Sequence, residues 1–92
     1  MFNKYEKAIM EQLLDILETE NLASAPAARI IDIDEKHSFS ILAKLFGEEI
    51  VLSWHSDELD DEVFVRLHMR WKKNWPLVVA VFAAAMKEAV EG

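Results

Sequence analysis

The residues with the clearest chemical potential alternate along one short segment of the chain, residues 63–73, with the sequence VFVRLHMRWKK. Side chains in an extended strand point alternately to the two faces of a sheet. One face of this segment is therefore apolar and belongs to a core, whereas the other face is basic. We term this basic face the cationic row; it consists of Arg66, His68 and Arg70, and Lys72 and Lys73 flank it.

An open sheet surface around the cationic row would collect further side chains from neighbouring strands. If residues 38–46 and 49–55 pair beside it, then Lys44 and the rings of Phe46 and Phe64 share its surface. Three interpretations stay open. The surface is a solvated face paired with acids on adjacent strands, it binds phosphates and bases, or it is a protein interface anchored by Arg and Phe.

A second candidate is the acidic segment 56–62, SDELDDE, which holds five carboxylates in seven residues. Its spacing lacks the central glycine and terminal glutamate of a calcium-binding EF-hand loop, so we predict no metal site. Clustered carboxylates speed the approach of a basic partner protein. The acidic residues predicted to contact a partner are Asp57, Glu58, Asp60 and Asp61.

Catalytic signatures are missing from the sequence. His37, His55 and His68 stand at no spacing that implies a nucleophile–base–acid triad, and there is no glycine-rich phosphate loop, HExxH or CxxC motif. No cofactor motif is present either. We therefore expect a protein that binds rather than catalyses, with no cofactor.

Length, composition and charge limit the kind of protein further. Ninety-two residues with 52% hydrophobic content and no cysteine predict one domain over residues 1–92, stabilised by packing alone in a reducing cytoplasm. Trp75 to Met86 is apolar but far shorter than the roughly 20 residues of a membrane span, and the first residues lack the apolar core of a signal peptide. We expect a cytoplasmic location and no membrane partner.

Charge is distributed unevenly along the chain. Residues 1–62 contain 15 acidic and five basic side chains, whereas residues 63–92 contain two acidic and five basic ones, within a net charge of −7. A strongly acidic majority opposes general binding to nucleic acids or anionic membranes and favours a basic protein partner.

The hydrophobic periodicity predicts the elements that position these residues. Asn3 and Glu6 have the spacing of a helix capping box, Gly47 marks a hairpin turn, and Asn74 with Pro76 marks a second helix start. The predicted elements are a helix over residues 3–20, strands over residues 29–34, 38–46, 49–55 and 63–73, and a helix over residues 75–90. This order predicts an α+β fold, an antiparallel meander of three to four strands flanked by an N-terminal and a C-terminal helix.

The C-terminal helix is apolar on nearly every side, so one sheet face cannot cover it fully. Either the helix lies between the sheet and the N-terminal helix, or it offers Val78 to Met86 to a second copy of the chain. The aromatic residues Trp71, Trp75 and Phe82 are expected in the core. The alternative for Trp75 is an exposed anchor that contacts a partner.

Two resemblances bear on function. The order of helix, meander and helix, with Lys72-Lys73 entering the last helix, resembles a double-stranded-RNA-binding domain, although His68-Met69-Arg70-Trp71 replaces the small, Ser-containing lead of that family. In size, acidity and lack of cysteine the whole chain is similar to the small phage-encoded inhibitors of the anti-CRISPR type. That likeness includes no shared motif.

The second resemblance implies a stoichiometric inhibitor that docks on a nucleic-acid-handling complex of a host cell and blocks it, with contact to the RNA of that complex permitted. The alternatives are a homodimeric structural or small-ligand-binding module, and a weak RNA- or DNA-binding domain. The residues expected to contact a partner are Lys44, Asp57, Glu58, Asp60, Asp61, Arg66, His68, Arg70, Lys72, Lys73 and Trp75.

Overall fold

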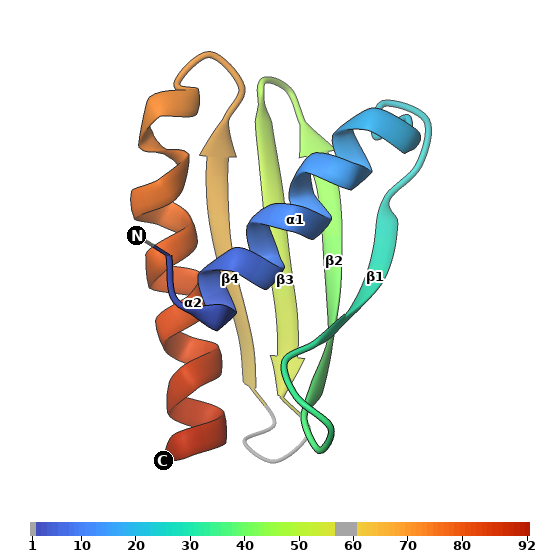
Figure 1. The fold of residues 1–92 in the computed structure, drawn as a ribbon. Coiled ribbons are helices and arrows are strands. Elements are labelled where there is room, and N and C mark those ends of the chain that lie inside the picture. Colours follow the sequence, from blue (N-terminus) through green and yellow to red (C-terminus); the bar gives the residue numbers. More distant parts are fainter. Residues whose placement is uncertain (1, 57–60) are drawn as a thin grey trace.

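A computed structural model describes residues 2–56 and 61–92 of the chain, and these residues form one four-stranded antiparallel sheet with a helix at each end of the sequence (Figure 1). Each strand pairs with the next along the chain, in the order β1-β2-β3-β4. The predicted α+β fold, an antiparallel meander flanked by two helices, is confirmed. The elements are α1 (Lys4–Thr19), β1 (Ala27–Asp32), β2 (Ser38–Phe46), β3 (Glu49–Ser56), β4 (Asp61–His68), a 3-10 turn (Lys72–Asn74) and α2 (Trp75–Glu91).

Local chemistry sets where the first elements begin and end. The side chain of Asn3 accepts a hydrogen bond from the backbone N–H of Glu6, at 2.9 Å, and caps the amino end of α1 as predicted. The turn between β2 and β3 begins at Gly47, whose φ of 59° suits a residue without a side chain. β1 starts and ends two residues before its predicted position, because the carboxylate of Asp34 accepts the backbone N–H groups of Lys36 and His37 and turns the chain.

The strand that carries the cationic row is shorter than predicted. β4 ends at His68, after which the backbone N–H of Trp71 donates to the His68 carbonyl at 3.0 Å and closes a turn. The backbone N–H of Arg70 also donates to the His68 ring, at 3.1 Å. Arg70, Lys72 and Lys73 therefore lie outside the sheet. Trp71 is 63% exposed, so its prediction as a core residue is wrong.

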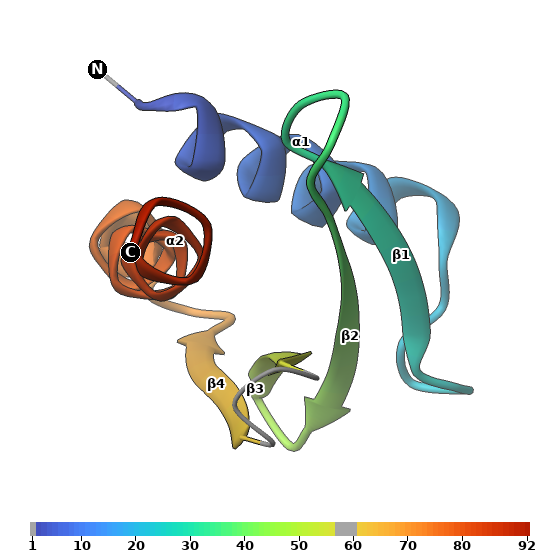
Figure 2. The ribbon, with the colours of Figure 1, turned by 90° about the horizontal axis from the view of Figure 1, so that it is seen from below.

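Both helices pack on the same, concave face of the curved sheet (Figure 2). α1 contacts β1 and α2, whereas α2 contacts β4 and α1, so the helices lie side by side in one layer. Inward-facing residues of every strand fill the space beneath them; within it, the rings of Phe39 and Trp54 meet edge to face, with centroids 4.9 Å apart. The helix–sheet core includes Ile9, Leu13, Ile16, Ile31, Ile41, Leu52, Leu67, Val79, Phe82 and Met86.

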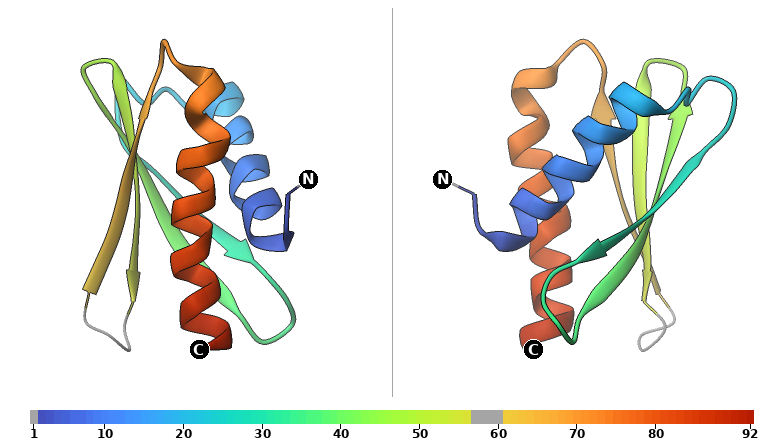
Figure 3. Two further views of the ribbon diagram at one scale, coloured as in Figure 1. Left: turned by 90° about the vertical axis from the view of Figure 1, so that its left-hand side faces the viewer. Right: turned by 45° about the vertical axis from the view of Figure 1, so that its right-hand side comes forward.

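The other face of the sheet is not covered by any element in the described part of the chain, as the two side views show (Figure 3). α2 is also not enclosed on all sides, because it lies beside α1 and not between α1 and the sheet. No helix among the described residues has both the length and the apolar character required to cross a membrane.

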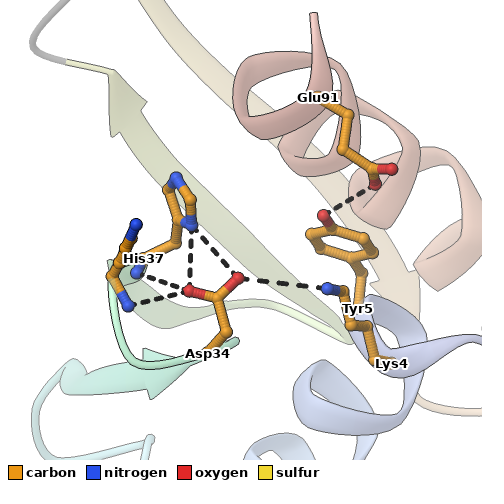
Figure 4. A network of polar contacts seen from close by, with 6 residues as sticks. Lys4, Tyr5, Asp34, His37 and Glu91 are labelled. Atoms are coloured by element: carbon orange, nitrogen blue, oxygen red, sulfur yellow. Dashed lines mark hydrogen bonds and ion pairs between the residues drawn. The ribbon is translucent and has the colours of Figure 1, made fainter.

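Polar contacts fasten the start of α1 to the end of α2 and to the turn after β1 (Figure 4). The buried hydroxyl of Tyr5 donates to the carboxylate of Glu91 at 2.8 Å. The amine of Lys4 lies 3.9 Å from the carboxylate of Asp34, which also lies 2.9 Å from Nδ1 of His37. The backbone N–H of Lys36 and the His37 ring lower the pKa of Asp34. These contacts link segments from both ends of the sequence.

Candidate interaction surface

The open face of the sheet gathers large apolar side chains beside basic ones. Strand register places Lys44 of β2 and Arg66 of β4 on either side of Val51 of β3, and it places Ser53 opposite Phe64. The rings of Phe46 and Phe64 are 62% and 57% exposed. We term the five residues Lys44, Phe46, Val51, Phe64 and Arg66 the open-face patch.

A hollow of about 340 Å³ lies within the open-face patch, lined by both phenylalanine rings, Val51, Arg66 and Glu49. Arg66 makes no ion pair with any residue in the described part of the chain. Arg66 therefore has guanidinium donors available next to two exposed rings. Arginine and aromatic residues are the types that most often dominate the binding energy of protein interfaces.

The cationic row divides into two parts with different surroundings. Arg66 belongs to the open-face patch, whereas His68 and Arg70 both approach Glu48 in the β2–β3 turn. An oxygen of Glu48 lies 2.8 Å from the guanidinium of Arg70, and its second oxygen lies 3.6 Å from Nε2 of His68. The His68 ring also stacks on Trp71, with centroids 4.8 Å apart. The interpretation of a basic face paired with acids thus describes His68 and Arg70, but not Arg66.

Trp75 is 3% exposed, and its indole N–H donates to the carbonyl of His68 at 2.9 Å. Its predicted contact with a partner is wrong, because the first turn of α2 directs this ring into the core. Lys72 lies over the same ring, with its amine 5.7 Å from the ring centroid, and Lys73 is exposed beside it. These lysines precede α2, away from the strand that was expected to carry the basic face.

Asp57, Glu58 and Asp60 lie outside the described residues, and Asp61 is placed only as the strand residue paired with Ser56. Among the residues that are described, no three His, Asp or Glu side chains gather as metal ligands would.

No family model, curated protein or solved structure matches this chain.

A second hollow, of about 720 Å³, lies at the end of the sheet near the carboxyl end of α2, and His37, Trp54, His55 and Val90 are among the residues that line it. The imidazole of His37 is already bonded to Asp34.

Alternation along the strands was sufficient to predict that Phe46 and Phe64 share a surface with Lys44 and Arg66. Sequence reasoning missed the contact of Glu48 with Arg70, which forms because the β2–β3 turn lies next to the end of β4. The glutamate in the tight hairpin turn was the available signal, because β3 pairs with β4 and brings that turn to the end of β4.

Proposed function

We propose that this protein is a non-catalytic inhibitor that docks its open sheet face on a larger protein assembly that handles nucleic acids, in the manner of anti-CRISPR proteins. The observation that carries the proposal is the pair of exposed rings, Phe46 and Phe64, beside Arg66, which has no ion pair with any described residue. Aromatic and arginine side chains at the centre of a surface supply most of the binding energy in protein complexes.

The charge of the molecule supports this class of partner. A net charge of −7 matches the basic grooves that such assemblies present to nucleic acids, and it opposes the approach of free RNA or DNA. The patch itself supplies apolar contact and an arginine for a carboxylate of the partner. The acidic side chains outside the patch would speed the approach to the basic partner, and the open-face patch would stabilise the complex once it has formed.

The experiment is affinity capture from a host-cell lysate, with the captured material compared between the natural chain and variants. We expect Phe64→Ser and Arg66→Glu each to reduce the amount of the specifically retained protein by at least about tenfold. Leu14→Ser is the matched control, because Leu14 is an exposed apolar residue of α1, on the helix side of the molecule. Retention that is equal for all four proteins would overturn the proposal.

Direct RNA binding is the second candidate, because exposed rings beside basic side chains on a sheet can stack bases and hold phosphates. Nuclease treatment of the lysate separates the two candidates. Capture that survives nuclease supports the protein partner. Capture that nuclease abolishes, together with a gel shift of RNA at low salt that disappears as salt rises, would replace the proposal with the second candidate.

A further inference from the structure

α2 leaves one of its sides uncovered. Leu77 and Val81 are 70% and 65% exposed, and Ala84, one turn further, is exposed as well. Residues at spacings of four and three lie along one side of a helix. In the left view of Figure 3, no other element lies in front of α2. An apolar stripe of this kind is uncommon on the surface of a helix that stays in water.

Opposite charges stand at the two ends of this stripe. Lys73 lies in the 3-10 turn, four residues before Leu77, and Glu88 lies in α2, four residues after Ala84. Both are exposed, and neither takes part in an ion pair within the described residues. α2 itself carries Lys87, Glu88 and Glu91, and Lys73 precedes it, so the charges of this segment balance within a molecule of net charge −7. Repulsion between two copies is therefore weak at this surface.

We propose that the outer side of α2 binds a second copy of this chain, with the two helices antiparallel about a twofold axis near Ala80 and Val81. This placement puts Leu77 opposite Ala84 of the partner subunit, so that a large side chain meets a small one. It also puts Lys73 opposite Glu88 of the partner subunit. Each contact occurs twice, because a twofold interface is self-complementary.

The occupant of the stripe is a second copy and not an unrelated helix because the stripe complements itself. When the second helix runs antiparallel to the first, each large residue of the stripe lies opposite a small one, and its positive end lies opposite its negative end. The contact is small, so the dimer forms at micromolar concentrations or above. This surface lies on the helix side of the molecule, and the proposal is independent of docking through the open-face patch.

Sedimentation of the full chain from about 10 µM to about 1 mM tests the dimer. We expect a rising fraction of dimer, and a dissociation constant at least about tenfold higher when Leu77→Glu and Val81→Glu are combined. Leu14→Glu is the control, because it places the same charge on an exposed leucine of α1 and should leave the dimer unchanged. A natural chain that stays monomeric throughout, or a dimer indifferent to the α2 substitutions, would overturn the proposal.

Charge exchange tests the antiparallel arrangement. Lys73→Glu and Glu88→Lys should each weaken the dimer about three- to tenfold, because each places like charges opposite one another, and their combination should restore it. A combination that is weaker than either single variant contradicts this register.

Crosslinking gives a test that does not depend on these weak charge effects. The chain has no cysteine, so a mixture of Leu77→Cys and Ala84→Cys variants should form disulfide-linked heterodimers on mild oxidation. A parallel pair would instead link each variant to itself, and that result would overturn the antiparallel dimer.

Discussion

The fold changes the chemistry of the phenol of Tyr5. Burial raises the pKa of its phenol to about 12 from an ordinary value of 10.0, and the hydrogen bond to Glu91 raises it as well. The folded state therefore favours the neutral phenol. Its contribution is fully present below pH 10.0 and is lost as the pH rises toward about 12, because the unfolded chain releases the proton first.

We expect the free energy of unfolding to fall over this alkaline range more steeply in the natural chain than in a Tyr5→Phe variant. Urea denaturation at a series of pH values from neutral to about 11.5 measures both curves. All other titratable groups are the same in both proteins, so the difference between the curves isolates Tyr5. Parallel curves would show that the phenol is not held in its neutral form by the fold.

At the same scale, the sequence predicts which side chains share a strand face but not which of them find partners. Arg66 and Phe64 follow from alternation along one strand. The contact of Arg70 with Glu48 does not, because the strand ends at His68 and the turn that follows redirects the next side chains. The burial of Trp75 and Phe82 agrees with the expected aromatic core, whereas Trp71 lies outside that core because the chain turns after His68.

At the scale of an element, α2 offers a comparison between two apolar residues with opposite environments. Phe82 is fully buried, whereas Leu77 is exposed. We expect Phe82→Ala to lower the free energy of unfolding by about 3–5 kcal/mol, through lost burial and a residual cavity. Leu77→Ala, measured by urea unfolding at a concentration where the chain is monomeric, should change it by less than about 0.5 kcal/mol. Similar losses for both variants would contradict the orientation of α2.

The sequence predicted the ends of helices and strands correctly where a single characteristic residue, such as a capping asparagine, a glycine or a proline, stands at the boundary. α1 begins after Asn3, β2 ends before Gly47, and α2 begins beside Pro76, all as predicted. The two strands that were placed less well, β1 and β4, end at turns formed by the side chain of Asp34 and by the backbone carbonyl of His68. The alternation of apolar and polar residues can continue in the sequence past such a turn, although the strand itself has ended.

At the scale of the whole molecule, the two helices and the sheet share one core, so we expect them to unfold together. Far-ultraviolet circular dichroism reports the helices, and fluorescence reports the buried Trp54 and Trp75. The two signals should give the same denaturation midpoint in urea. Midpoints that differ would mean that α1 detaches while the sheet and α2 remain folded.

The contact between α1 and α2 also has a consequence for how the chain folds as it is made. α1 is the first of these elements to leave the ribosome, and α2, one of the two elements that cover its apolar side, is the last. Neighbouring strands can pair in turn during synthesis, because each hairpin is local. β1 can cover part of the apolar side of α1 early, but the rest is covered only after α2 has been synthesised. Until then α1 is exposed to chaperones and proteases, and completion of the fold waits for translation of its final segment.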